Sequence, residues 1–222
     1  IDKLNFFFLF FMKTVLVTGG TGFIGSHTVL SLLLKGYKVL VIDSNINSSP
    51  EVLKRIKLIL QDIDPEKYKN LKFFKGDLKN YDFLENIFHN YFERGIKIEA
   101  VIHFSGLKCV SESIKKPLDY WNENICGTIN LLKILDKYNC NNLIFSSSAA
   151  VYGEKNQMPI KEFVNLSPSN PYANTKEAIE RMINDFYKSN SNNLNIIILR
   201  YFNPIGAHSS GLMGEDPIGI PN

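Results

Sequence analysis

Short apolar segments alternate with longer amphipathic ones along almost the whole chain. The apolar segments predict strands over 14–18, 38–43, 71–75, 98–104, 142–146 and 195–200. Periodicity and capping residues predict helices over 23–34, 50–61, 80–92, 119–138 and 171–190. Several strands are apolar at every position, as expected when helices cover both faces of a parallel sheet. The alternation therefore predicts an α/β fold, with a doubly wound parallel sheet in the strand order 3-2-1-4-5-6.

The turn after the first predicted strand is rich in glycine. Gly20, Gly22 and Gly25 satisfy G-x-G-x-x-G. Gly19, Gly22 and Gly25 also satisfy G-x-x-G-x-x-G. Glycine lets the backbone turn tightly and approach a ligand, and the following helix directs free N–H groups at a pyrophosphate. The turn thus predicts a dinucleotide site in a Rossmann-type domain, although such turns also occur for structural reasons alone.

Acidic residues follow the second and third predicted strands. Asp43 lies close to the spacing of about 20 residues at which a carboxylate hydrogen-bonds the adenosine ribose. It would repel a 2′-phosphate, so NAD is the expected cofactor rather than NADP. Asp77 is placed to accept from the adenine amino group, although a solvated loop aspartate explains it almost as well.

The composition is that of an ordinary globular protein. Of 222 residues, 45% are apolar and 21% charged, and the net charge of +3 is spread without a dense basic block. We therefore expect neither a nucleic-acid partner nor an acidic membrane surface. The cysteines are Cys109, Cys126 and Cys140, and the histidines are His27, His89, His103 and His208. Neither set has metal-ligand spacing, so we expect no metal site, and reduced thiols fit a cytoplasmic protein.

An apolar run of residues 6–12, rich in phenylalanine, precedes the first strand. It is far shorter than the ~20 residues that span a bilayer. A signal peptide is the alternative, but no small-residue cleavage site follows. We expect Met12 to be the true start and 1–11 to be a leader outside the fold, because the chain begins with Ile.

A Ser–Tyr–Lys set follows the fifth predicted strand. Tyr172 and Lys176 are one helical turn apart, and a run of serines ends at Ser148. This arrangement is similar to the constellation of the short-chain dehydrogenase/reductase superfamily. A free tyrosine titrates near ~10, so about 4 kcal/mol of stabilisation is needed to bring its pKa near 7. Lys176 and an oxidised nicotinamide ring are the expected positive charges, and an exposed Tyr/Lys pair is the plain alternative.

Longer motifs extend the likeness over Met12 to Asn222. They are Val17–His27, His103–Ser113, Phe145–Gly153, Pro171–Lys176, Arg200–His208 and Gly214–Asn222. With them the chain resembles the UDP-glucose 4-epimerase family, within the NAD-dependent epimerase/dehydratases. Ala149 and Ala150 stand where the related 4,6-dehydratases carry an Asp-Glu pair. The resemblance implies interconversion of UDP-galactose and UDP-glucose through a 4-keto intermediate, with NAD retained.

The resemblance also implies roles for individual residues. Ser148, Tyr172 and Lys176 would be catalytic, with Ser148, Tyr172 and Asn203 on the substrate. NAD would be bound by Gly19, Gly22, Phe23, Ile24, Gly25, Asp43, Ser44, Asn47, Ser48, Asp77, Leu78, Phe104, Ser105, Gly106, Lys108, Asn124, Tyr172, Lys176, Tyr201 and Phe202.

The chain departs from the family in several places. Ala150 replaces a usual Thr or Ser, and Phe23 replaces a frequent Tyr. We expect an NAD-binding domain over 12–200 and the start of a truncated substrate segment over 201–222, with the smaller sugar-nucleotide domain largely missing. The full-length protein would be a homodimer through the helices 119–138 and 171–190. Other nucleotide-sugar epimerases, such as those for UDP-glucuronate, and a non-catalytic NAD-binding regulator are the alternatives, and the fragment by itself could be inactive.

Overall fold

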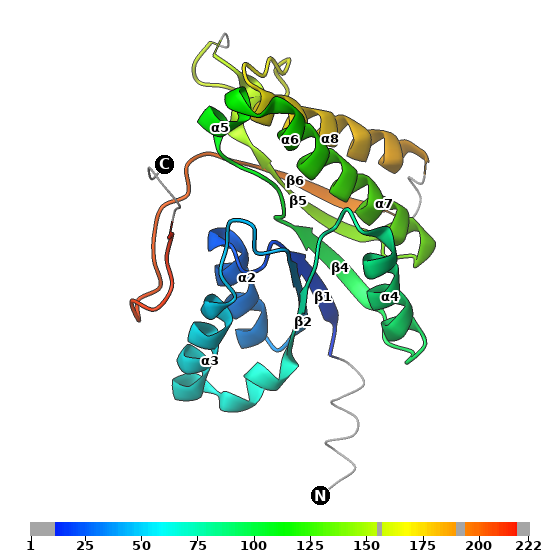
Figure 1. Cartoon of the computed structure of the whole chain (residues 1–222), viewed down its shortest axis with the longest axis vertical. Coiled ribbons are helices and arrows are strands. Elements are labelled where there is room, and N and C mark those ends of the chain that lie inside the picture. The colour runs from blue at the N-terminus through cyan, green and yellow to red at the C-terminus, as the bar shows by residue number, and fades with distance from the viewer. Residues whose placement is uncertain (1–11, 155–156, 190–193, 217–222) are drawn as a thin grey trace, which may run out of the picture.

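The computed structural model describes residues 12–154, 157–189 and 194–216. A parallel six-stranded sheet runs through the centre, with helices on both faces (Figure 1). Its strands are β1 (Thr14–Thr18), β2 (Lys38–Asp43), β3 (Leu71–Lys75), β4 (Ile98–His103), β5 (Asn142–Ser148) and β6 (Asn195–Tyr201). The observed order is β3-β2-β1-β4-β5-β6, which confirms the predicted doubly wound fold.

Two separate hydrophobic cores lie on the two faces of the sheet. The long helices are α2 (Phe23–Leu34), α3 (Glu51–Ile63), α4 (Tyr81–Phe92), α7 (Gly127–Lys137) and α8 (Pro171–Ser189). Val15 and Val17 of β1 pack with α2 and α3, whereas Leu16 between them packs with α4, α7 and α8. Successive strand residues point to opposite faces, so both sets must be apolar.

The single helix predicted over 119–138 is wrong, because the chain there forms three consecutive segments. They are α6 (Pro117–Trp121), the π-helical turn η2 (Asn122–Cys126) and α7. Pro117 suits the first turn of α6, where its missing N–H costs no hydrogen bond. The π turn adds a residue to the helical backbone, and Asn124 within it is buried. A further short helix, α5 (Val110–Lys115), was not predicted.

The other boundaries agree with the sequence within a few residues. β5 and β6 extend to Ser148 and Tyr201, while β4 ends one residue before Phe104. Two 3₁₀ segments, η1 (Pro65–Asn70) and η3 (Ala149–Tyr152), were not predicted. Two helix ends carry typical capping residues: the Gly36 N–H (φ 83°) donates to the Leu33 carbonyl after α2, and the Asn170 side chain accepts from the Ala173 N–H at the start of α8.

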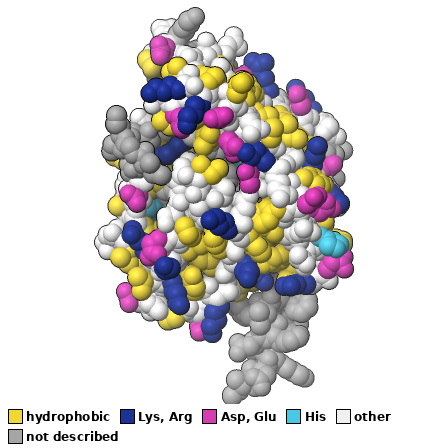
Figure 2. Space-filling model, viewed as in Figure 1, with side chains coloured by type: hydrophobic (Ala, Val, Ile, Leu, Met, Phe, Trp, Pro, Cys, Tyr) yellow, Lys and Arg dark blue, Asp and Glu magenta, His cyan; other side chains and the backbone are white. Residues whose placement is uncertain are grey.

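The surface carries both signs of charge. Basic and acidic side chains are interspersed on the face shown in Figure 2. Within the described residues, no helix is long and apolar enough to cross a membrane. Of the apolar run 6–12, all but Met12 lies outside the described residues.

Two leucines of α3 provide a test of the packing between this helix and the sheet. Leu60 is fully buried against the sheet, whereas Leu58 on the same helix is 50% exposed. We predict that Leu60→Ala lowers the free energy of unfolding by about 2–5 kcal/mol, because it removes buried methyl groups and leaves a cavity. Leu58→Ala, the matched control, should cost less than about 1 kcal/mol. Urea unfolding measures both, and equal losses would contradict the assignment of the core.

Candidate functional site

The glycine turn brings the end of β1, the start of α2 and the loop after β4 into close contact. A Cβ on Gly25 would lie 2.2 Å from the Gly19 carbonyl oxygen, and one on Gly19 (φ 68°) would lie 2.7 Å from the Ser105 nitrogen. Among the described residues no side chain caps the N-terminus of α2, and its first turn holds no acid. The turn is therefore a cradle in which the glycines leave the backbone open, backed by a helix N-terminus whose partial positive charge suits a phosphate.

The Asp43 carboxylate is buried beside this turn and supports it. It accepts hydrogen bonds from the Thr21 N–H (3.1 Å), the Asn45 N–H (3.0 Å) and the Ser48 hydroxyl (3.0 Å). A carboxylate has about four acceptor positions, so about one remains for a ligand. The structure thus shows a role for Asp43 that the sequence did not predict, because its hydrogen bonds hold the glycine turn in place.

The loop after β3 lies at the same edge of the sheet. Asp77 accepts from the Lys79 N–H at 2.8 Å, and Leu78 is buried against Gly127. Asn130 of α7 donates to the carbonyl oxygens of Leu78 and Lys79 at 3.1 and 2.9 Å. These bonds hold the predicted adenine loop to α7.

Asn124 fixes the loop after β4, which contains the predicted cofactor residues Phe104 to Lys108. Its side chain accepts from the Leu107 N–H at 2.8 Å and donates to the Leu107 carbonyl at 3.2 Å. A Cβ on Gly106 (φ 146°) would lie 2.9 Å from the Asn124 oxygen, so the close approach requires glycine. Asn124, predicted to line the cofactor groove, uses its amide to shape the loop that forms it.

The structure brings the predicted Ser–Tyr–Lys set together beyond β5. Ser148 ends β5 and caps η3, where its hydroxyl accepts from the Ala150 N–H at 3.2 Å, and this hydroxyl is close enough to the Tyr172 phenol to act on its pKa. Lys176, one turn along α8, is buried and donates to the Ser146 carbonyl at 2.8 Å. Its ammonium nitrogen lies 6.0 Å from the centre of the Tyr172 ring. The exposed-pair alternative is therefore excluded.

Burial opposes the charges that this set would carry. It raises the pKa of the Tyr172 phenol, and the Ser148 hydroxyl acts in the opposite direction. Burial also lowers the pKa of Lys176 to about 8, against the attraction of Glu180. The described residues alone do not supply the lowered tyrosine pKa that the sequence led us to expect, so additional positive charge is required.

A buried ion pair lies one turn beyond Lys176, and sequence reasoning missed it. Glu180 accepts from the Arg200 guanidinium at 3.0 and 2.7 Å and from the Ser147 hydroxyl. Arg200 also lies over the Tyr152 ring and donates to the Glu162 carbonyl at 2.9 Å. The Glu180 hydrogen bonds raise the pKa of Arg200, and this network ties α8 to β5 and β6. The spacing Tyr172–Lys176–Glu180, with each residue four positions from the last, was the available signal.

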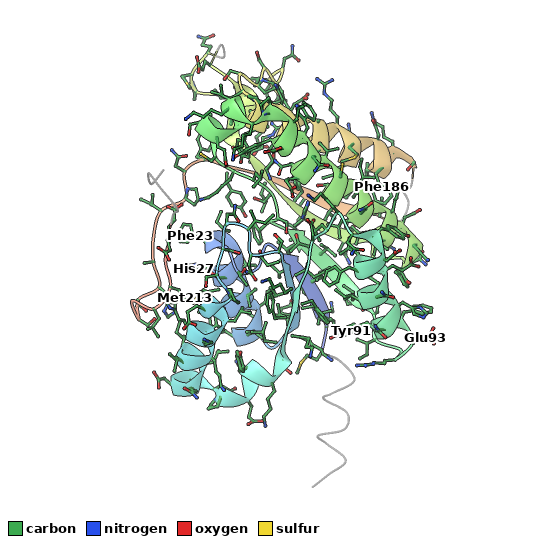
Figure 3. All side chains as sticks on the ribbon, in the orientation of Figure 1. Phe23, His27, Tyr91, Glu93, Phe186 and Met213 are labelled. Carbon is green, nitrogen blue, oxygen red and sulfur yellow. The ribbon has the colours of Figure 1, made fainter. Side chains whose placement is uncertain are left out.

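After β6, the segment 202–216 leaves the sheet and runs past α2 and α3 (Figure 1). Met213 is buried in the α2–α3 core, and Figure 3 labels it with Phe23 and His27 of α2. Lys108 and Glu215 form an ion pair of 2.8 Å across the site. Tyr201 is half-buried, and burial raises the pKa of its phenol. Phe202 and Asn203 are exposed, and within the described residues neither forms a hydrogen bond with another predicted site residue.

His103 is a buried structural residue. Its Nδ1 lies 2.7 Å from the Thr18 hydroxyl and its Nε2 lies 3.0 Å from the Thr128 hydroxyl. Burial, with a smaller effect of Lys176, lowers its pKa to about 3. Within the described residues no group of His, Cys, Asp and Glu is placed to hold a metal ion.

The fold and the site together define a class of protein. A parallel sheet with a glycine cradle and a Ser–Tyr–Lys set at neighbouring strand ends is a nucleotide-binding domain of the short-chain dehydrogenase/reductase type. Residues 16–219 match the family described as GDP-mannose 4,6 dehydratase, and the chain belongs to that family.

Of three similar proteins, two carry the name UDP-glucose 4-epimerase and one is described as a bifunctional protein. UDP-glucose 4-epimerase 2 of Arabidopsis thaliana is 50% identical over 210 residues, which are 95% of this chain and 57% of that protein. Bifunctional protein GAL10 of Pachysolen tannophilus is 48% identical over 215 residues, 95% of this chain and 29% of that protein. The structure of UDP-glucose 4-epimerase from Bifidobacterium longum, in complex with NAD⁺ and UDP, has a TM-score of 0.84 at 43% identity and covers 94% of this chain. This chain covers 59% of it.

These likenesses confirm the predicted resemblance to UDP-glucose 4-epimerases. The chain spans less than two thirds of each of these three proteins. What is similar is therefore the nucleotide-binding part that the fold defines.

The burial of His103 predicts how stability depends on pH. Its pKa is about 3 when folded and about 6.5 when unfolded, so the unfolded chain binds more protons below pH 6.5. Stability from this group is complete above pH 6.5 and is lost as the pH falls toward 3. We predict a loss of about 2 kcal/mol between pH 7 and pH 5 that His103→Gln lacks. Urea unfolding of both proteins at the two pH values measures the difference, and equal pH dependence would contradict it.

Proposed function

We propose that this chain is the NAD-binding part of a UDP-glucose 4-epimerase, which interconverts UDP-galactose and UDP-glucose. The observation that carries the proposal is that Ser148, Tyr172 and the buried Lys176 lie together, with the Lys176 ammonium 6.0 Å from the centre of the Tyr172 ring, at the sheet edge that holds the glycine cradle. The similarity to proteins named UDP-glucose 4-epimerase supports it.

The cradle fits a dinucleotide. Two of its glycines face backbone at distances that exclude a Cβ, and α2 begins without a side-chain cap. We assign the pyrophosphate to the N–H groups of Phe23 and Ile24, and the adenosine to Asp43, Ser44, Asn47, Ser48, Asp77 and Leu78. We assign the nicotinamide end of NAD to the loop 104–108, Lys176, Tyr201 and Phe202. The Bifidobacterium relative was solved with NAD⁺, which supports the same cofactor here.

The residues of this chain divide the proton chemistry between them. Tyr172 accepts the proton of the sugar C4 hydroxyl and later returns it, while Ser148 orients that hydroxyl against the phenol. Lys176 binds the nicotinamide ribose and adds positive charge near the phenol. NAD⁺, when bound beside these residues, would supply the hydride chemistry at C4 of the sugar.

The pKa of Tyr172 explains why the cofactor would have to be resident. Burial raises this pKa, and Lys176 is itself pushed toward neutrality. The positive charge of an oxidised nicotinamide ring would oppose both effects and favour the phenolate. The base would then form only when the hydride acceptor is present.

The small residues after Ser148 favour epimerisation over loss of water. Ala149 and Ala150 begin η3, next to Ser148, and neither can donate a proton for elimination. The family description names a dehydratase, but the resemblance in sequence puts an acid pair at these two positions in such enzymes. We assign Asn203 to the UDP diphosphate; UDP was bound in the Bifidobacterium relative.

We further propose that the whole protein is a cytoplasmic homodimer. The helices α5 and α6 expose apolar side chains, among them Ile114, Leu118 and Trp121. Together with α7 and α8 they are placed to form a helical bundle with a second copy.

Replacing Tyr172 tests the reaction. Tyr172→Phe should lower the conversion of UDP-galactose by 10²-fold or more, because it removes the acid–base group. Tyr37→Phe, before β2 at the other end of the strands, is the control and should leave the rate unchanged. The 222-residue chain is assayed beside a full-length version, without added reductant. Full-length protein that binds NAD yet never converts the sugar would overturn the proposal in favour of a regulator.

Asp43 tests the choice of cofactor. Asp43→Asn removes the charge that repels a 2′-phosphate and keeps the size of the side chain. We predict that the preference for NAD over NADP falls by about tenfold, or about 1.4 kcal/mol. Because Asp43 also accepts from the Thr21 and Asn45 N–H groups, both affinities should be compared within the variant. Titration calorimetry measures them, and an unchanged ratio would contradict the role.

A further inference from the structure

A continuous series of buried and partly buried hydrogen bonds connects the end of β1 and the loop after β4 to the turn of α8 that carries Tyr172. Its members come from β1, from β4 and the loop after it, and from η2, α7 and α8. They are Thr18, His103, Ser105, Leu107, Asn124, Thr128, Tyr172 and Thr175.

The first half of the series has a fixed direction. The Thr128 hydroxyl donates to the Asn124 carbonyl at 2.6 Å, so it must accept from His103 Nε2–H. His103 Nδ1 is then an acceptor, and the Thr18 hydroxyl donates to it at 2.7 Å. The Ser105 N–H in turn points at the Thr18 hydroxyl at 3.4 Å. A neutral His103 is consistent with its low pKa and fits only this one proton arrangement.

The second half passes through the side chain of Asn124. Besides its two bonds to Leu107, the amide nitrogen donates to the Thr175 hydroxyl at 2.9 Å. Thr175 then donates to the Tyr172 carbonyl at 2.7 Å. Both the amide and the hydroxyl are buried, so each bond is made without competition from water.

The bond from Thr175 to Tyr172 is ordinary by itself, because threonines in helices often bond a carbonyl three or four residues earlier. The bond from Asn124 is different. It comes from the π turn 51 residues away, and the same amide shapes the loop 104–108. Thr175 is therefore the one described side chain that hydrogen-bonds both this amide and the backbone of Tyr172.

We propose that Thr175 is a positioning residue for the reaction, which holds the cofactor loop 104–108 and the Tyr172 turn in a fixed relation. This inference rests on the proposed function. One rigid unit then positions both the Tyr172 phenol and any ligand that binds against the loop 104–108. Loss of the hydroxyl leaves the Asn124 donor buried without its acceptor and loosens both ends.

Thr175→Val and Thr175→Ser form the test pair, since valine keeps the shape and serine keeps the hydroxyl. Thr14→Val is the matched control, because the Thr14 hydroxyl is buried with no hydrogen-bond partner among the described residues. NAD affinity is measured by calorimetry. The Tyr172 pKa is measured with and without NAD by NMR of ¹³C-labelled tyrosine, its signal assigned by its loss in Tyr172→Phe.

We expect Thr175→Val to raise the Kd for NAD about tenfold and to reduce the fall in the Tyr172 pKa that NAD causes. Thr175→Ser should restore both to within about twofold, and Thr14→Val should change neither. If Thr175→Val does not fold, as judged by urea unfolding, Thr128→Val interrupts the same series and should raise the Kd in the same direction.

Two results would overturn the inference. In the first, Thr175→Val has the same Kd for NAD and the same NAD-dependent change in the Tyr172 pKa as the parent protein. In the second, Thr175→Ser and Thr175→Val change these two quantities equally, which would indicate that packing alone matters. Both readouts are independent of turnover. If the full-length protein binds NAD but does not convert UDP-sugars, the proposed function fails while these measurements still decide the role of Thr175. A parent chain that binds no NAD overturns both.

Discussion

The hydrogen-bond register of the parallel strands is the constraint on which the rest of the structure depends. It aligns Thr18 with His103, and His103 with Phe145, so β1 and β4 end together, while β5 continues beside β6 to Ser148. The glycine turn, the loop 104–108 and the Ser148 turn therefore leave the sheet at one edge. A slip of one residue would exchange the two faces of a strand. Neighbouring residues of β1 pack in separate hydrophobic cores, so the register is strongly specified. The register in turn determines where the loops of the site leave the sheet.

Burial then determines the chemistry available at that edge. The same low-polarity surroundings raise the pKa of Tyr172, lower that of Lys176 and keep His103 neutral. Glu180 is buried beside them and accepts hydrogen bonds from Arg200 and Ser147. A cationic ligand entering such a site has a larger effect than it would in water. The proposed coupling between cofactor and base follows from this property rather than from any single contact.

Family membership and function are separate conclusions here. The domain belongs to a family described by a dehydratase, and its fold is shared by many activities. Chemistry depends on a few positions, of which Ala149 and Ala150 are the most informative because they lack the acid that elimination needs. Lys108 and Glu215, paired across the edge, show how the segment after β6 comes to lie over the site.

The sequence by itself determined the strands, their order, the glycine cradle and the Ser–Tyr–Lys set, because each depends on local periodicity or on short spacings. It did not predict the π turn at Asn124, the Glu180–Arg200 pair or the hydrogen bonds by which Asp43 holds the glycine turn. Only the tertiary structure decided these, since they depend on contacts between residues 20 to 51 positions apart. It also decided the direction of the Tyr172 pKa, because burial is set by the elements that surround the phenol.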